Sequence, residues 1–190
     1  MSDVKQAPGE LANVQAFVNT LDIERDADEL ASPAALAEWL IAQGLADPGL
    51  VAVTDADLAN AIGLRESLRS VLVAHNADGV VDADVAAALD EAASRSRMRL
   101  RFDKTGTGTL EPEATGVDGA IGRLLGIIHR AAADGSWDRL KACREHTCGW
   151  AFYDHTKNRS GTWCDMRVCG NRAKARAYRE RRGGDARVRG

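Results

Sequence analysis

Apolar and polar residues alternate along the first two thirds of the chain with the period of an α-helix. Over residues 11–20, apolar side chains recur three and four positions apart, which predicts an amphipathic helix. A second helix is predicted to begin at Ser32-Pro33, because serine caps helix N-termini and proline is favoured at the first helical position. Its apolar pattern runs to Gly44, where the helix should end.

Three further helices follow from the same spacing. Thr54 with Asp57 three residues later has the form of a capping box, and the apolar positions behind it predict a helix of about six turns. An alanine-rich helix is predicted over about 82–94, and another over 117–133 is stopped by Gly135. Helices built mainly from Ala, Leu, Val and Ile favour a closely packed helical body.

Between these helices the period changes from helical to two. Over 97–102, methionine, leucine and phenylalanine alternate with arginine, which predicts a half-buried strand with an arginine face. Residues 104–108 form a glycine-bearing turn, and 109–114 return as a weaker strand that Pro112 places at an edge. The arginines could contact phosphate, but an exposed strand face beside an acidic body is the preferred interpretation. They are Arg97, Arg99 and Arg101.

Charge divides the chain into two unlike parts. Residues 139–190 carry 14 Lys and Arg against 5 Asp and Glu, a net of +9, whereas residues 1–138 carry 11 against 23, a net of −12. Together the two parts give the formal net charge of −3. This asymmetry indicates an acidic body attached to a basic module that seeks a polyanion, although the two parts could also attract each other.

The sequence also indicates where in the cell the protein is located. Its first ten residues are small and polar, and no apolar run approaches the ~20 residues of a membrane span. We therefore expect a cytoplasmic protein with no membrane partner. Disulfides are disfavoured in the cytosol, so a tight cysteine cluster points to metal or redox chemistry. The frequent Ala, Arg, Gly and Asp with few Lys suggest a high-GC bacterial gene.

All four cysteines lie within 27 residues and form two pairs, Cys143 with Cys148 and Cys164 with Cys169. Four residues separate the members of each pair, and fifteen residues separate the pairs. Two chelating turns at this separation are typical of a tetrahedral four-thiolate zinc site, although a gap of two within each pair is commoner. Four thiolates complete the coordination of the ion, so the expected cofactor is one structural Zn²⁺.

The residues around the cysteines predict a small zinc-binding fold. A knuckle, a hairpin and a helix that donates the last ligand make a treble-clef-like finger, and metal binding would supply most of its folding energy. Asp165 can cap the helix, which carries Cys169 in its first turns. The predicted elements are a strand over 150–153, a turn over 156–161, a returning strand at Thr162-Trp163 and a helix from Met166 to about Arg182.

The predicted fold is therefore mainly α with one β-hairpin. A multihelical N-terminal domain precedes a small treble-clef-like zinc finger at the C-terminus. The expected divisions are a flexible arm over 1–10, a helical domain over 11–137 with its hairpin near 97–114, a finger with a basic helix over 138–182, and a disordered tail over 183–190.

Other chemistry at the cysteines stays open at this point. A redox dithiol usually places its cysteines two apart rather than four, and two cytosolic disulfides are disfavoured. His146 or His155 could replace one cysteine as a ligand. An iron–sulfur cluster also uses four thiolates, so the sequence alone does not separate iron from zinc. His75 and His129 lie within predicted helices and are interpreted as surface or capped residues.

The helix after Cys169 is strongly basic. Arg172, Arg176 and Arg179 recur at helical spacing, and Lys174 lies among them. Such a stripe has the electrostatic footprint of phosphate contacts, and arginine suits bidentate contacts to guanine edges in a major groove. These four residues are the candidate nucleic-acid contacts, and DNA is the expected partner. The alternative is that the helix docks on the acidic body.

At Cys169-Gly170-Asn171-Arg172 the chain resembles the bacterial CGNR zinc-finger family. Its N-terminal part is similar to the ABATE domain, which is described as a stress-induced transcription regulator. The resemblance implies that the four cysteines bind zinc and that a DNA-binding C-terminus follows a helical domain of unknown ligand. The other matching segments are 150–154, 158–160 and Trp163-Cys164 in the finger, and 17–20, 64–69 and 117–120 in the helical domain.

These features together predict a transcription regulator with a zinc finger on DNA and a helical body that senses a small-molecule effector or a protein partner. A single finger seldom supplies enough interface for tight specific binding, so a homodimer is expected. The alternative is a ligand- or protein-interaction module whose finger is purely structural and docks on the body. The sequence has no nucleophile elbow, phosphate-cradling loop or three-ligand metal motif, so no enzymatic activity is predicted.

Overall fold

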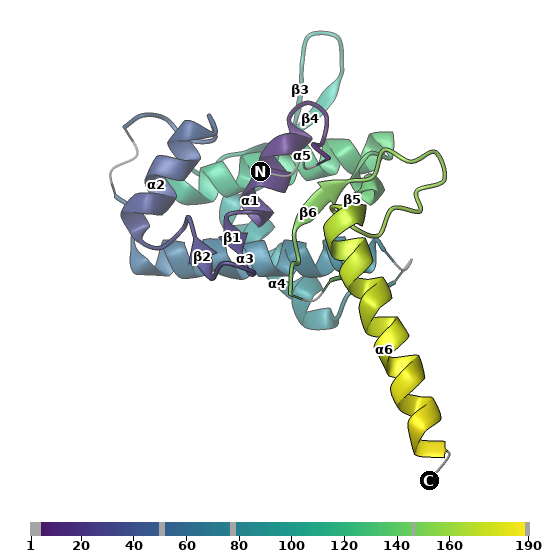
Figure 1. Cartoon of the computed structure of the whole chain (residues 1–190). Coiled ribbons are helices and arrows are strands. Elements are labelled where there is room, and N and C mark those ends of the chain that lie inside the picture. Colours follow the sequence, from purple (N-terminus) through teal and green to yellow (C-terminus); the bar gives the residue numbers. More distant parts are fainter. Residues whose placement is uncertain (1–4, 50–51, 77–78, 146, 189–190) are drawn as a thin grey trace.

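The computed structural model describes residues 5–49, 52–76, 79–145 and 147–188, with side chains as far as residue 179. Helices dominate this part of the chain, and three small antiparallel two-stranded sheets lie among them (Figure 1). The mainly α fold predicted from the sequence is confirmed. The helices are α1 (Leu11–Val18), α2 (Pro33–Ala42), α3 (Asp55–Ala74), α4 (Ala83–Ser96), α5 (Gly116–Asp134) and α6 (Asn171–Val188), with short helical turns η1 (Trp137–Arg139) and η2 (Met166–Gly170). The paired strands are β1 (Leu21–Asp22) with β2 (Ala27–Asp28), β3 (Met98–Phe102) with β4 (Gly108–Pro112), and β5 (Leu140–Ala142) with β6 (Ala151–Tyr153).

The helix boundaries follow the local signals in the sequence. Ser32 Oγ accepts a hydrogen bond from the Ala35 amide at 3.1 Å and so caps α2. At the start of α3, Thr54 and Asp57 form the predicted capping box, in which each side chain accepts from the other residue's amide. Helix α5 ends at Gly135, whose φ of 76° is the left-handed conformation that glycine adopts without strain.

The core lies where α1, α3 and α5 contact one another. Helix α4 packs on α3 and α5, and α2 contacts α3 (Figure 1). None of the described helices combines the length and the apolar character that a membrane crossing requires. The largest fully buried apolar side chains of this core are Phe17, Leu30, Leu36, Leu40, Leu68, Leu72, Leu124 and Leu140.

The β3–β4 hairpin is far more exposed than the alternating pattern predicted. Its base packs on α5, where a Cβ on Gly122 would come within 2.5 Å of the Pro112 Cβ atom. Towards the tip, Leu100 and Phe102 are 55% and 68% exposed, and the hairpin projects from the body (Figure 1). The predicted hairpin is confirmed, but the predicted half burial of its first strand was wrong, because alternation shows which side chains share a face but not whether another element covers that face.

The arginine face of this hairpin is balanced by its own acidic residues. Arg99 donates to the Glu113 carboxylate at 2.6 Å, and Arg101 lies 3.3 Å from the same carboxylate. The hydrogen bond from Arg99 lowers the pKa of Glu113 below its usual value. These contacts fit the interpretation of an exposed strand face rather than a phosphate site.

The finger is not a separate appendage, because its hairpin belongs to the core of the body. Leu140, Ala142 and Ala151 are fully buried in the same cluster as the helix side chains. Strand β6 pairs with β5, in the register Leu140↔Tyr153, and not with Thr162-Trp163 as predicted. The predicted pairing was wrong because the apolar residues that continue the body's core precede Cys143, whereas the segment after β6 is a polar loop.

Polar side chains of the body also bind the β6 backbone. Asn19 Oδ1 accepts from the Ala151 amide at 2.7 Å, while the side-chain amides of Asn19 and Gln15 donate to the Ala151 carbonyl. Arg69, which is 7% exposed, donates to the carbonyls of Gly149 at 2.7 Å and Val18 at 2.6 Å. One guanidinium therefore joins α3, α1 and the start of β6.

Replacing Arg69 should loosen this junction. We expect Arg69→Met to lower the free energy of unfolding by about 2–4 kcal/mol, because two buried carbonyls lose charge-assisted hydrogen bonds and keep no donor. Urea unfolding followed by circular dichroism measures the change. The matched control is Arg130→Met, whose guanidinium is about half exposed and contacts Glu10, and which should stay within about 0.5 kcal/mol of wild type. Equal effects of the two changes would contradict a joining role for Arg69.

Sequence patterns missed the β1–β2 hairpin, whose strands are two residues each and too short to show alternation. Arg65, 2% exposed on α3, donates to Asp28 Oδ1 at 2.7 Å and to Thr20 Oγ1 at 3.2 Å. Burial alone would raise the pKa of Asp28, but the hydrogen bonds from Arg65 and the Leu30 amide and the charges of Arg65 and Arg69 together outweigh it, so the net pKa is lowered. The ion pair fixes the hairpin beside α1 and α3.

Both ends of the chain differ from expectation within the described residues. The arm expected to be flexible over 1–10 is fixed from residue 5, because Lys5 accepts from the Tyr153 amide at 2.8 Å and buried Ala7 donates to Gln15. Residues 1–4 lie outside the described part. Where a disordered tail was expected over 183–190, the backbone of α6 stays helical to Val188. Each added helical residue gains a hydrogen bond once the helix has begun, and this segment contains no proline.

Candidate metal centre and basic helix

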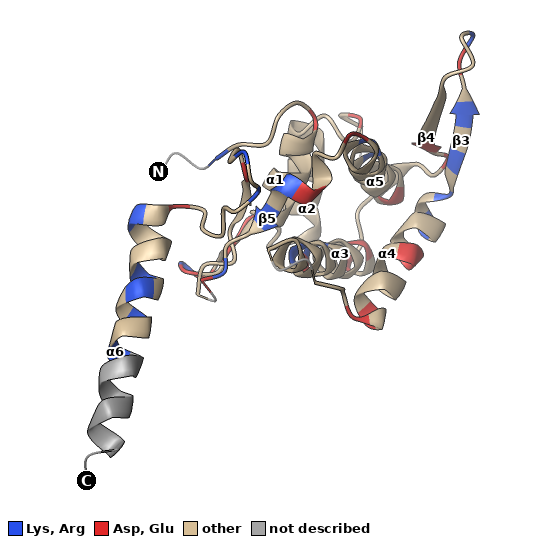
Figure 2. Ribbon diagram, turned by 90° about the vertical axis from the view of Figure 1, so that its right-hand side faces the viewer, with Lys and Arg blue, Asp and Glu red and all other residues tan. Residues whose placement is uncertain are grey.

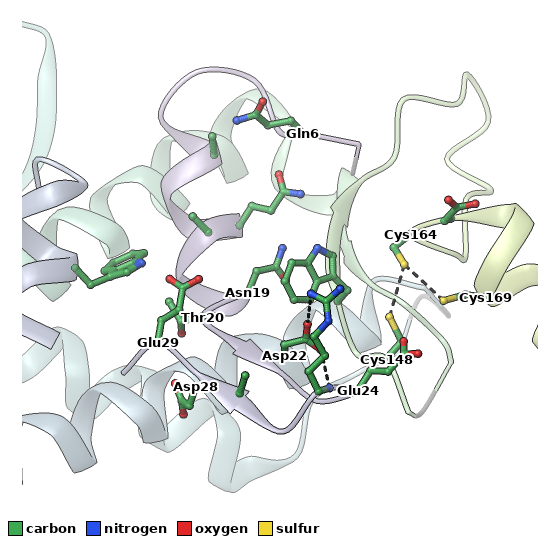
Figure 3. Close-up of a pocket in the computed structure, with 18 of the residues that line it drawn as sticks. Gln6, Asn19, Thr20, Asp22, Glu24, Asp28, Glu29, Cys148, Cys164 and Cys169 are labelled. Atoms are coloured by element: carbon green, nitrogen blue, oxygen red, sulfur yellow. Dashed lines mark hydrogen bonds and ion pairs between the residues drawn. The ribbon is translucent and has the colours of Figure 1, made fainter. Parts of the chain in front are cut away.

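The turn between β5 and β6 and the segment that leads into α6 bring the four cysteine thiols together. Cys143 directly follows β5, Cys148 lies two residues before Trp150 at the approach to β6, Cys164 ends the long loop after β6, and Cys169 belongs to η2. The four sulfur atoms lie within 4.8 Å of one another. Cys164 Sγ is 3.6 Å from Cys148 Sγ and 3.7 Å from Cys169 Sγ (Figure 3).

The turn between Cys143 and Cys148 is held by backbone hydrogen bonds. The amides of Cys148 and Gly149 donate to the Glu145 carbonyl at 2.8 and 3.1 Å, and the Cys143 amide donates to Trp150 at 2.9 Å. Gly149 has a φ of 57°, and a Cβ at this position would approach Ile23 Cδ1 to 2.7 Å. The left-handed backbone conformation therefore favours glycine here, whereas the side chain of Ile23 could shift to admit a Cβ.

The second pair is held by a short, wide helical turn. The Asp165 carboxylate accepts from the Arg167 amide at 2.7 Å and caps η2 as predicted, while the Asp165 carbonyl accepts from the Cys169 amide at 3.0 Å. Asn171 Nδ2 then donates to the Arg167 carbonyl at 2.8 Å. This bond joins η2 to α6, so Asn171 orders the start of the basic helix.

The sulfur positions fit one tetrahedral metal ion. Four thiolates at about 2.3 Å from a common zinc ion lie about 3.8 Å apart, close to the two spacings given above. Hydrogen bonds from the Cys148 and Cys164 thiols lower the pKa of Cys143 to about 2, whereas burial raises the pKa of Cys169 to about 12. A bound dication lowers the pKa of all four thiols and lets them ionise together.

The alternatives raised by the sequence fit this geometry less well. The cysteines are free thiols rather than disulfides. His155 points elsewhere, with Nε2 3.1 Å from the Gln6 carbonyl, and His146 lies outside the described residues. A four-iron cluster binds each thiolate to a different iron, which spreads the sulfurs farther apart than a single ion does. Because four ligands leave no open position, the site is suited to structure rather than catalysis.

A buried ion pair holds the loop that joins the two cysteine pairs. Lys141 Nζ lies 2.9 Å from Asp154 Oδ2, with both side chains at most 4% exposed. Lys141 also donates to the carbonyls of Arg159 and Gly161, and Asp154 accepts from the amides of Thr156 at 3.0 Å and Gly161 at 2.7 Å. Residues 156–161 are therefore fixed although they form no regular element.

The four candidate nucleic-acid contacts fall into two classes. Arg176 forms a bidentate ion pair with Glu145 at 2.9 and 3.0 Å, and Arg172 pairs with Glu24 of the β1–β2 loop at 2.7 Å. The hydrogen bond from Arg172 lowers the pKa of Glu24. Lys174 and Arg179 are exposed and form no ion pair with a carboxylate whose side chain is described.

The arginine stripe predicted from helical spacing is thus partly turned towards acidic residues. Glu145 is 1% exposed and ties α6 to the turn between the first two cysteines, so Arg176 has a structural role. Sequence reasoning could not identify Glu24 and Glu145 as partners, because isolated glutamates carry no motif. The helix itself projects away from the body (Figure 2), which leaves its outer face accessible.

Comparison with known proteins identifies both parts of the chain. Residues 12–135 match the model of the ABATE family, described as "Putative stress-induced transcription regulator". Residues 139–182 match the model of the CGNR zinc finger. No individual curated protein is similar enough to the chain to count as a match. The CGNR match and the four close thiols together identify the metal as one structural zinc ion.

Proposed function

The chain belongs to the ABATE family and ends in a CGNR zinc finger, and from this premise we propose that it is a DNA-binding transcription regulator whose helical body senses a small molecule or a protein partner. The main support for this proposal is the position of α6. The helix begins at the metal centre and projects from the body with Lys174 and Arg179 unpaired among the described side chains (Figure 2). A rigid, projecting, basic helix can reach phosphates that the acidic body would otherwise repel.

The proposal includes two further features. A homodimer is part of it, because one finger offers less interface than tight specific binding to DNA needs. It includes no catalysis, since four thiols leave the ion no position for a substrate or an activated water.

Binding to duplex DNA is expected to weaken steeply as salt rises. Each phosphate contact adds about 0.9 to the slope of log affinity against log salt concentration. The double change Lys174→Ala/Arg179→Ala should therefore reduce that slope by about 2 and weaken binding to all sequences alike. Fluorescence anisotropy with a labelled duplex between ~50 and ~200 mM salt measures both quantities.

The matched control is Arg99→Ala/Arg101→Ala, which removes two exposed arginines from the β3–β4 hairpin and should leave the slope unchanged. A wild-type protein that does not bind duplex DNA at ~50 mM salt, where phosphate contacts are strong, would contradict the proposal.

The contact between Arg172 and Glu24 favours a second function, in which the finger only docks on the body. In the DNA-binding proposal, Glu24→Gln frees Arg172 for phosphate and should modestly raise DNA affinity, whereas Arg172→Ala should not. A module that uses its finger only for docking would bind DNA neither as wild type nor as Glu24→Gln. The two variants therefore separate the two functions.

A further inference from the structure

A large groove lies between the helical body and the zinc centre. Its volume is about 1250 Å³, which is ample for a small molecule. One side is formed by α1, the β1–β2 hairpin and the end of α2, and the other by the finger (Figure 3). Cys148, Cys164 and Cys169 belong to the finger side, so the groove reaches the metal centre itself.

The groove offers apolar and aromatic surface. Ala12 and Ala16 lie one helical turn apart on α1 and make a flat wall, and Trp39 and Trp150 also line the groove. Tryptophan is the aromatic side chain that binds cations most strongly through its face. Trp150 Nε1 is buried and has no hydrogen-bond partner among the described residues.

The charged lining is strongly acidic. Arg25 is one cation on the wall, and its guanidinium group is mostly exposed and 3.4 Å from Asp22. Zinc held by four thiolates adds roughly two negative charges to the finger side. The lining carboxylates are Asp22, Glu24, Asp28, Glu29 and Asp165.

The nearby arginines neutralise only part of this charge. Asp28 is paired with Arg65 and Glu24 with Arg172, both at 2.7 Å. Asp22 lies 3.4 Å from Arg25, and Asp165 lies 3.9 Å from Arg167. Glu29 forms no side-chain hydrogen bond or ion pair within the described part of the chain, and it lies on the body side of the groove near Thr20 (Figure 3). A ligand that enters this groove therefore meets a negative potential on both sides.

We propose that the groove binds a small organic cation with an apolar or aromatic body. The positive charge is held by Glu29 and its acidic neighbours, and the apolar part lies against the alanine wall and the tryptophans. This inference rests on the proposed sensing role of the body and names the class of its effector. Such a ligand would contact the body and the turn that begins α6 together, since Asp165 and Val168 line the same groove.

The test uses two ions of the same shape and opposite charge. Tetraphenylphosphonium and tetraphenylborate are titrated separately into the zinc-loaded full-length protein by calorimetry, in the absence of DNA. We expect the cation to bind at least about tenfold more tightly than the anion, because the charged lining favours it by more than one exposed ion pair. Equal affinity, tighter binding of the anion, or no binding of the cation would overturn the proposal.

Two variants locate the site. Glu29→Gln should weaken binding of tetraphenylphosphonium about fivefold, and Ala12→Met, which fills the groove from α1 with a good helix former, should weaken it more. Glu38→Gln removes an exposed carboxylate of α2 outside the groove and should change nothing. If the cation binds Glu29→Gln and Ala12→Met as tightly as wild type, its site is elsewhere and the inference is wrong. The DNA titration without the cation reports separately on the proposed function.

Discussion

Loss of the zinc ion is expected to destabilise the helical body as well as the finger. The double change Cys164→Ser/Cys169→Ser removes one chelating pair, and we expect the protein to lose its metal and at least about 4 kcal/mol of stability, a fall in Tm of about 8–16 °C for a chain of this size. The reason is that β5 leads directly into the turn that carries the other two cysteines, and β6 follows that turn. Leu140 and Ala151 on these strands are fully buried in the common core.

Zinc per chain by mass spectrometry and thermal unfolding by far-ultraviolet circular dichroism measure the effect. Thr147→Ser is the control, since it lies in the same turn between Cys143 and Cys148 but offers no thiol. A chelator added to the wild-type protein should reproduce the double variant. If the helical signal of the metal-free protein melted at the wild-type temperature, the finger would be energetically independent of the body.

The second large effect is expected at the buried pair of Lys141 and Asp154. Asp154→Ala should lower the free energy of unfolding by about 3–5 kcal/mol, because it leaves the Lys141 ammonium buried without a counter-charge. It also deprives the Thr156 and Gly161 amides of their acceptor. Denaturant unfolding of the zinc-loaded protein at neutral pH measures the loss. Asp138→Ala is the control, because its pair with Arg159 is exposed and should contribute little.

The same pair has a predictable pH dependence. Burial alone would raise the pKa of Asp154, but hydrogen bonds from Lys141, Thr156 and Gly161 outweigh it and hold the pKa well below its usual range. A lowered folded-state pKa means that the stabilisation is fully present above the unfolded-state value of about 3.9 and is lost as the pH falls below it. The stability difference between wild type and Asp154→Asn should therefore be constant above about pH 5 and shrink in acid. A difference that grew as the pH fell would contradict this assignment.

The metal centre was open to prediction from the sequence because chelation imposes short spacings. Cys143 with Cys148 and Cys164 with Cys169 each close a turn of six residues, which is a local structure. The pairing of the strand over 151–153 was predicted wrongly for the opposite reason. Its partner Leu140–Ala142 is short, lacks a strand-like pattern of its own, and is selected by burial against α3.

The groove and the ion pairs of the basic helix were also outside the reach of sequence patterns. Glu24 lies 148 residues from Arg172, and Glu145 lies 31 residues from Arg176. The helical spacing predicted that Arg172, Arg176 and Arg179 share a face. It could not show that Arg172 and Arg176 pair with two glutamates, whereas Lys174 and Arg179 form no ion pair among the described side chains.

The sequence by itself determined where most helices begin and end, that four thiols form a metal site, and that a basic helix follows it. These features depend on capping side chains, glycine conformations and residue spacing, and all of them act within a few residues. Only the tertiary structure decided that the finger shares the core of the body, that the β3–β4 hairpin stays exposed, and which of the described cations of α6 pair with glutamates. Those outcomes depend on which distant surfaces exclude water from one another, and that free energy belongs to the packed chain rather than to any local pattern.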